Sequence, residues 1–152
     1  MPKIKEGLTS SFLREFFKKF SKFVGVFSQD QLQDIKLTEN QFCIINLDFA
    51  NETGSHWIGL KLKKKSIEIY DSLGFTSSGW FKKPYFLLKF LLCYQKSHRI
   101  FITPHLQHSL SFLCGFYLLY FFSSNKSLAN KLRSFSRLKS YNDGFIKNLY
   151  HL

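Results

Sequence analysis

The amino-acid sequence predicts an α+β fold in which helices pack against a central, mostly antiparallel sheet. Two observations lead to this class. A strand-like stretch that begins at His56 is joined by Lys63-Lys64-Lys65 to a second one that ends at Asp71, which is typical of a β-hairpin. Apolar residues at helical spacing occupy both the segment before Phe23 and the segment after Cys114. With 152 residues, the chain is expected to form a single domain over positions 1–152.

The composition indicates a globular and strongly basic protein. Hydrophobic residues make up 45% of the chain, and the formal net charge is +12. Such an excess of positive charge attracts polyanions, above all nucleic acid, although it could equally serve solubility. The candidate phosphate contacts are Arg14, Lys18, Lys19, Lys22, Lys63, Lys64 and Lys65.

The cysteine count and the apolar runs indicate a soluble intracellular protein. The three cysteines, Cys43, Cys93 and Cys114, are widely spaced, so they predict neither a disulfide framework nor a metal site and suggest a reducing compartment. The N-terminus lacks the apolar core of a signal peptide, and the longest apolar run, Phe112 to Phe122, is too short to span a bilayer. No membrane partner is therefore expected.

The first third of the chain is predicted to contain two helical segments and a strand. Phenylalanines at helical spacing predict a helix over Thr9 to Phe23, with Ser10 or Ser11 as its cap. A short turn-and-helix segment is expected over Val26 to Asp34. The stretch from Gln41 to Leu47 is rich in β-branched and aromatic residues, and predicts a strand with Cys43 in the core.

The hairpin is the feature that brings two chemically useful side chains together. Turn-forming residues, Asn51 to Ser55, precede His56, and the two strands are joined by the lysine turn. Because neighbouring ends of an antiparallel pair lie side by side, we expect His56 and Asp71 to meet.

The rest of the chain is predicted to be mainly helical. A turn at Ser72-Leu73-Gly74 leads to a helix that carries Trp80 and Phe81, with Pro84 early in it and Cys93 packed near its end. A strand is expected over Arg99 to Thr103. Two helices are expected after the Cys114 helix, over 128–138 and 145–149, separated by a break near Asn142-Asp143-Gly144.

Cys114 is predicted to lie in the first turn of a buried helix. Ser109 and Ser111 are good N-cap residue types, and a wholly apolar run follows the cysteine. Unpaired backbone N–H groups and the helix dipole favour a thiolate at that position. The alternative is a buried cysteine that packs as a small hydrophobe.

Four residues together are typical of a nucleophilic cysteine. A thiolate needs a base that accepts its proton, and His56 has the acidic neighbour Asp71 to orient it. Gln107, seven residues before Cys114, and the Cys114 backbone N–H could donate hydrogen bonds to an oxyanion. Taken singly, Asp71 could be only a turn residue and Gln107 only a surface residue.

These residues resemble the adenovirus protease (adenain) family, and more distantly the ubiquitin-like-protein proteases of the same clan. The matching motifs are Gly54-Ser55-His56-Trp57, Tyr70-Asp71-Ser72-Leu73-Gly74-Phe75, Gln107 with Cys114-Gly115, Gly25-Val26-Phe27-Ser28 and Cys43-Ile44-Ile45-Asn46. The resemblance covers about Phe23 to Phe122. It implies a papain-like cysteine endopeptidase with Cys114 as nucleophile, His56 as base, Asp71 as orienting carboxylate and Gln107 as oxyanion donor.

The resemblance also implies a biological role. It suggests a viral protease, acting as a monomer in the virion and the host nucleus or cytoplasm, that cleaves capsid or core precursor polypeptides beside small residues such as Gly. No cofactor would be required for the chemistry, but DNA would be an activating polyanion and partner. Two alternatives remain open: a protease for ubiquitin-like modifiers (a deubiquitinase or deSUMOylase), and a non-catalytic DNA-binding virion protein.

The chain departs from adenain at two places. Adenain uses Glu at the position of Asp71, whereas the ubiquitin-like-protein proteases use Asp there, as this chain does. Adenain is activated by a peptide that is disulfide-linked to the strand before its Gln, and the matching stretch here, Arg99 to Thr103, has no cysteine. This argues against activation by a disulfide-tethered peptide.

Overall fold

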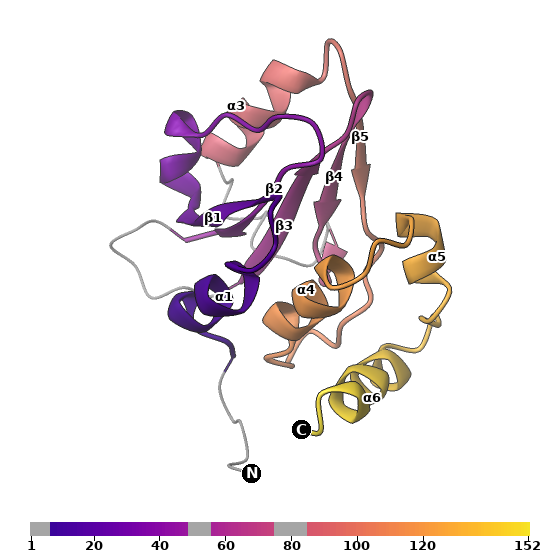
Figure 1. Cartoon of the computed structure of the whole chain (residues 1–152). Helices are drawn as coiled ribbons and strands as arrows, with labels where there is room; N and C mark the ends of the chain where they lie inside the picture. The colour runs from indigo at the N-terminus through magenta and orange to yellow at the C-terminus, as the bar shows by residue number, and fades with distance from the viewer. Residues whose placement is uncertain (1–6, 49–55, 75–84) are drawn as a thin grey trace.

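The computed structural model describes residues 7–48, 56–74 and 85–152. The predicted turn at Asn51–Ser55 and the predicted helix start with Trp80, Phe81 and Pro84 lie outside the described residues. In the described part, a central sheet is flanked by helices, which confirms the α+β class (Figure 1).

The sheet has five strands, and their spatial order follows the order of the chain. The strands are β1 (Phe23–Ser28), β2 (Phe42–Asn46), β3 (Trp57–Leu62), β4 (Ser66–Tyr70) and β5 (Arg99–Ile102). The middle three strands are antiparallel to one another, whereas β1 runs parallel to β2 and β5 runs parallel to β4. The pairing is therefore more mixed than the mostly antiparallel sheet that the sequence predicts.

Helices cover both faces of this sheet. They are α1 (Ser10–Phe17), the 3₁₀ helix η1 (Gln29–Asp34), α3 (Tyr85–Tyr94), α4 (Cys114–Phe122), α5 (Leu128–Leu132) and α6 (Lys139–Leu149). Figure 1 shows η1 and α3 on one side and α1, α4, α5 and α6 on the other. The two crossovers between parallel strands run through η1 and α3 in the same direction, so the right-handed rule places both on one face. The opposite face is left for the helix that begins at Cys114.

The two faces of the sheet bury separate hydrophobic clusters. Along β2, Phe42 and Ile44 pack into the cluster that contains α1 and α4, whereas Cys43 and Ile45 pack into the cluster that contains η1 and α3. A strand buried on both faces is a continuous apolar run rather than an alternating one. This explains why the 42–45 stretch is apolar throughout, and it confirms the predicted strand with Cys43 in the core.

Gly59 in β3 lets α4 approach the sheet closely. A Cβ atom at this position would lie 2.4 Å from the Phe122 ring, and Leu118 is also within contact distance. The Phe122 ring stacks on Phe42 with centroids 4.3 Å apart. Because β3 begins one residue after His56 and α4 begins at Cys114, this close packing sets where the two side chains lie relative to each other.

The N-terminal part of the prediction needs correction. The helix predicted over Thr9 to Phe23 ends at Phe17, and its cap is Thr9, whose Oγ1 accepts a hydrogen bond from the Phe12 N–H at 3.2 Å. Phe23 begins β1 instead. Likewise, the segment after Val26 stays extended to Ser28, and only Gln29–Asp34 is helical. The strand was missed because its partner, β2, pairs with it in parallel and gives no hairpin signal.

The C-terminal part is partly confirmed. The strand predicted over Arg99 to Thr103 is β5. Cys93 lies exposed near the end of α3 rather than packed, and α5 is shorter than the helix predicted over 128–138. The break predicted near Asn142 to Gly144 is wrong, because α6 runs through it. None of the described helices has the length and apolar character needed to span a membrane.

Candidate active site

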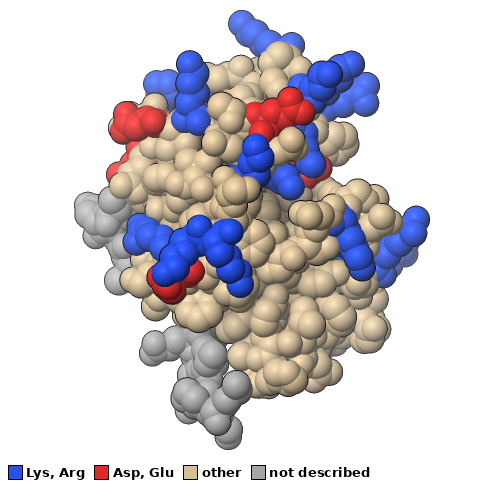
Figure 2. Space-filling view, viewed as in Figure 1, with Lys and Arg blue, Asp and Glu red and all other residues tan. Residues whose placement is uncertain are grey.

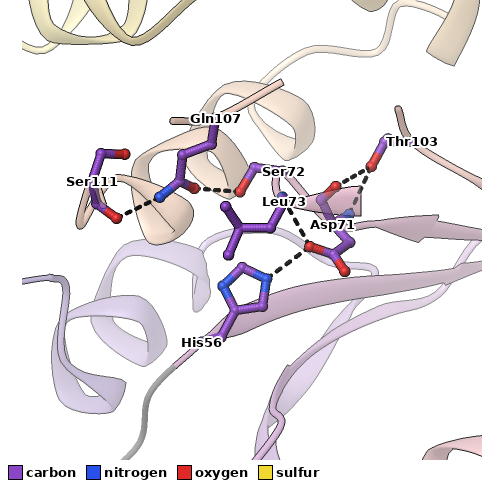
Figure 3. A network of polar contacts seen from close by, with 7 residues as sticks. All are labelled: His56, Asp71, Ser72, Leu73, Thr103, Gln107 and Ser111. Atoms are coloured by element: carbon purple, nitrogen blue, oxygen red, sulfur yellow. Dashed lines mark hydrogen bonds and ion pairs between the residues drawn. The ribbon is translucent and has the colours of Figure 1, made fainter. Parts of the chain in front are cut away.

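The β3–β4 hairpin brings His56 and Asp71 into direct contact, as the sequence predicts. The His56 Nε2 atom lies 2.7 Å from the Asp71 Oδ1 atom. His56 is 5% exposed and Asp71 is fully buried, so water does not screen the interaction. Figure 3 shows the His56 ring at the start of its strand turned toward the Asp71 carboxylate.

The chemistry of the two groups sets the orientation of the ring. An ionised carboxylate can only accept hydrogen bonds, so His56 Nε2–H donates to Asp71. Cys114 also lies close enough to His56 to raise the pKa of the imidazole. Because Nε2 is engaged by Asp71, Nδ1 is the ring nitrogen that remains for the thiol. The imidazole therefore bridges the carboxylate and the cysteine.

This environment favours the protonated form of His56. Burial alone would lower the pKa of His56, but the hydrogen bond to Asp71 and the interactions with Cys114 outweigh the burial and raise the pKa above its ordinary value of 6.5. The stabilisation that the protonated ring adds to the folded state is fully present below pH 6.5. It is lost as the pH rises through the raised pKa of the folded protein.

The Asp71 position is held by neighbours that the sequence analysis missed. Its Oδ1 atom also accepts a hydrogen bond from the Leu73 N–H at 3.0 Å. The Thr103 hydroxyl both accepts from the Asp71 N–H at 2.8 Å and donates to the Asp71 carbonyl at 2.7 Å. Thr103 follows β5, so its role could have been found only by knowing that β5 lies beside β4.

Gln107 is buried, which excludes the alternative of a surface residue. Its Nε2–H donates to the Ser111 carbonyl at 2.6 Å, and its Oε1 accepts from the Ser72 hydroxyl at 2.6 Å (Figure 3). A carbonyl can only accept, so this pair of contacts fixes which end of the amide is the donor. An amide nitrogen carries two hydrogens, and within the described residues Ser111 takes one of them. That the amide donates to an oxyanion stays a prediction.

Cys114 is the first residue of α4 and is 7% exposed. The predicted caps Ser109 and Ser111 do not cap this helix; Leu113 occupies the N-cap position. A leucine side chain cannot accept a hydrogen bond, so the N-cap residue itself does not cap the first amides of α4. The prediction failed because the helix begins only at Cys114, so Ser111 lies two residues before the N-cap position, and its buried hydroxyl makes no hydrogen bond within the described residues.

Leu8 ties together the residues that follow His56 and Cys114. The Trp57 indole N–H donates to the Leu8 carbonyl at 2.8 Å. The Leu8 side chain packs on Gly115 so closely that a Cβ atom at Gly115 would lie 2.9 Å from it. The segment before α1 thus helps to hold β3 and α4 together beside the candidate site.

The structure therefore brings the four predicted residues into one region by two kinds of contact. His56 is hydrogen-bonded to Asp71, and Cys114 lies close enough to shift the pKa of its ring. Gln107 is joined to this group through Ser72, which adjoins Asp71, and through Ser111 in the segment that leads to Cys114. The arrangement can supply a nucleophile, a base, an orienting carboxylate and an oxyanion donor. The roles themselves stay predictions.

Comparisons with known proteins show the fold. No family model and no curated protein matches the sequence. Among solved structures, the chain is similar to the crystal structure of the ASFV pS273R protease, with a TM-score of 0.50 and 18% sequence identity. The match covers 90% of this chain but only 65% of that protein, so this chain spans less than two thirds of it.

Proposed function

We propose that this chain is a cysteine protease in which Cys114 is the nucleophile. The observation that carries the proposal is the buried His56, whose ring is hydrogen-bonded to the Asp71 carboxylate and lies close enough to Cys114, the first residue of α4, for the thiol to shift its pKa. The similarity in fold to a viral protease supports the same reaction class.

The contacts of each residue correspond to a step of peptide hydrolysis. Cys114 Sγ would attack the carbonyl carbon of the scissile bond while its proton resides on His56. The carbonyl oxygen, now negative, would accept hydrogen bonds from Gln107 Nε2–H and the Cys114 N–H. His56 would then protonate the leaving amine, leaving a thioester that water hydrolyses with His56 as base. Asp71 would keep the ring oriented through both steps.

For the substrate, we propose virion precursor polypeptides cut beside small residues such as Gly. The solved protease of similar fold, ASFV pS273R, is named after a virus. The resemblance of the His56, Asp71, Gln107 and Cys114 motifs to adenain points the same way. A panel of Gly-containing peptides and ubiquitin-like modifier fusions would separate this substrate class from the modifier-protease alternative. Cleavage of the fusions alone would favour that alternative.

Selective alkylation of Cys114 is the first expected result. Burial raises the pKa of Cys43 to about 12, so this thiol should resist iodoacetamide near neutral pH. Cys93 is exposed and should react at an ordinary rate, which makes Cys93→Ser the background of choice. In that background, brief labelling followed by mass spectrometry should find the label on Cys114.

The matched control is His56→Gln in the same background. Because His56 and Cys114 lie close enough to interact electrostatically, this change should slow the labelling of Cys114. In the protein that retains Cys93, His56→Gln should leave the labelling of Cys93 unchanged. An equal rate for Cys114 with and without His56 would remove the histidine from the activation of the thiol, and would favour a non-catalytic protein.

We also propose DNA as a polyanionic partner, bound away from the candidate site. Lys64 and Lys65 are exposed at the turn between β3 and β4, opposite the hairpin end that holds His56 and Asp71. Arg14 and Lys18 are weaker candidates than the sequence suggests, because Arg14 donates to the Val26 carbonyl and Lys18 pairs with Glu15. Figure 2 shows the basic side chains over α1 separated by uncharged surface from those at the top of the view.

If DNA binds through its phosphates, the logarithm of the affinity should fall linearly with the logarithm of the salt concentration. The slope of log affinity against log salt should be about −0.9 for each phosphate contacted on duplex DNA. Lys64→Glu should weaken binding, whereas Lys147→Glu on the exposed surface of α6 serves as the charge-matched control. Titration of labelled duplex DNA at several salt concentrations measures both effects. No binding at low salt would leave the charge as a solubility feature.

A further inference from the structure

We infer that Asn142 and Asp143 of α6 are positioning residues for Gln107. The inference rests on the proposed function, because it assigns these two residues to the placement of the oxyanion donor. Together they hold the backbone on both sides of Gln107 and connect it to the helix that begins at Cys114. The sequence suggested instead that Asn142-Asp143-Gly144 interrupts a helix.

Asn142 holds the backbone that precedes Gln107. Its Nδ2 group donates to the Leu106 carbonyl at 3.1 Å and to the Ser136 carbonyl at 2.9 Å. Its Oδ1 atom accepts from the Ser136 N–H at 2.8 Å. Asn142 is fully buried, and these contacts use both of its donor hydrogens and its acceptor. A buried amide with every group bonded has one low-energy orientation, so it fixes the Leu106 carbonyl in space.

Asp143 holds the backbone that follows Gln107. Its Oδ2 atom accepts a hydrogen bond from the His108 N–H at 3.3 Å. Its Oδ1 atom accepts from the Tyr117 hydroxyl at 2.8 Å. Tyr117 lies in α4 one turn beyond Cys114, and its ring stacks on Phe135 with centroids 5.6 Å apart. The carboxylate therefore connects the oxyanion-donor segment to the nucleophile helix.

The Gln107 segment needs such support because it has no regular secondary structure. Residues 103–113 lie between β5 and α4 and belong to neither. An oxyanion donor must lie within a few tenths of an ångström of its productive position, and small displacements cost large factors in rate. α6 is the regular element from which two adjacent side chains reach both flanks of Gln107. Loss of the Asn142 contact or the Asp143 contact should therefore displace the Gln107 amide, although neither residue would itself contact the substrate.

The first test separates positioning from stability. Asn142→Ala should lower kcat for a peptide amide by on the order of 10-fold to 100-fold and leave KM nearly unchanged. Ile146→Val, also fully buried in α6 but apolar, is the control for lost packing. It should lower the melting temperature without lowering kcat. Tyr117→Phe removes only the hydroxyl that contacts Asp143, and it should lower kcat by a smaller factor than Asn142→Ala does.

The second test asks whether Asn142 acts through Gln107. In a Gln107→Ala background, Asn142→Ala should change kcat by about twofold or less, because the group that it positions is gone. Equal losses in both backgrounds would overturn the inference and leave Asn142 as a merely structural residue. That outcome would not touch the proposed function, which depends on cleavage by the unmodified protein and on its loss in Cys114→Ala.

A third readout does not require cleavage. The side-chain amide signals of Gln107 in a ¹⁵N-labelled sample can be assigned by their absence in Gln107→Ala. They should shift or broaden in Asn142→Ala and stay in place in Ile146→Val. Unchanged signals in Asn142→Ala would overturn the inference even if the protein proves to have no protease activity.

Discussion

Replacing His56 by alanine should reduce peptide cleavage by on the order of 10⁴-fold or more, the largest effect expected from any single side chain other than Cys114. The ring lies beside both partners that the proposed base needs: the Cys114 thiol, which shifts its pKa, and the Asp71 carboxylate, to which it is hydrogen-bonded. Steady-state cleavage of a fluorogenic peptide, with enzyme concentration set by active-site labelling, would measure the loss.

A second variant, His56→Gln, distinguishes a loss of catalysis from a loss of stability. Removing His56 leaves the fully buried Asp71 carboxylate without its histidine partner, which costs about 3–5 kcal/mol in comparable buried pairs. His56→Gln keeps an N–H donor for Asp71 but provides no base. It should fold better than His56→Ala and be equally inactive. Activity in His56→Gln close to that of the unmodified protein would assign the base elsewhere.

The Asp71 variants give the graded comparison. Asp71→Asn should lower the rate of peptide cleavage less than the loss of His56 does, because an amide can still orient the ring in part. Asp71→Glu should retain some activity, since adenain uses a glutamate at the resembling position. Full activity in Asp71→Ala would remove this residue from the mechanism.

Replacing Gln107 by alanine should lower kcat by about 10²-fold to 10³-fold, the range for losing one oxyanion donor. KM should change little, because the contact strengthens only when the carbonyl oxygen becomes negative. The measurement is a full Michaelis–Menten comparison on one peptide amide. A loss confined to KM would place Gln107 in substrate binding.

Ser72→Ala is the matched control for this prediction. It removes the hydroxyl that donates to Gln107 Oε1 but leaves the Nε2 contact with Ser111 in place. The donor should therefore remain, less well fixed, and kcat should fall by a smaller factor than in Gln107→Ala. Equal losses in the two variants would mean that Ser72 acts in some way other than by holding the amide.

The sequence predicted the parts of the site that depend on local pairing. His56 and Asp71 meet because consecutive antiparallel strands place their ends together, and the lysine turn between the strands is visible in the sequence. Cys114 begins α4 as expected, because an apolar helical run starts there. Parallel pairing leaves no such local signal, which is why β1 was not predicted.

The rest of the site depends on contacts between distant polar residues. Asn142 and Asp143 are typical of turns, but here their side chains are buried and bonded to Leu106, Ser136, His108 and Tyr117, so the helix continues through them. Thr103 supports Asp71 across 32 positions of sequence. Such pairs are set by tertiary packing, which overrides the local preferences that sequence patterns report.

The order of the strands also has a consequence for how the protein is made. Each strand of the sheet pairs with the one synthesised before it, so a chain that emerges from the ribosome can add strands one at a time. The His56–Asp71 contact belongs to one such hairpin and can form before α4 exists. The backbone on both sides of Gln107, in contrast, is held by α6, the last helix described. A nascent chain would thus acquire its base early and its oxyanion donor late, and we expect it to stay inert toward neighbouring polypeptides until α6 has docked.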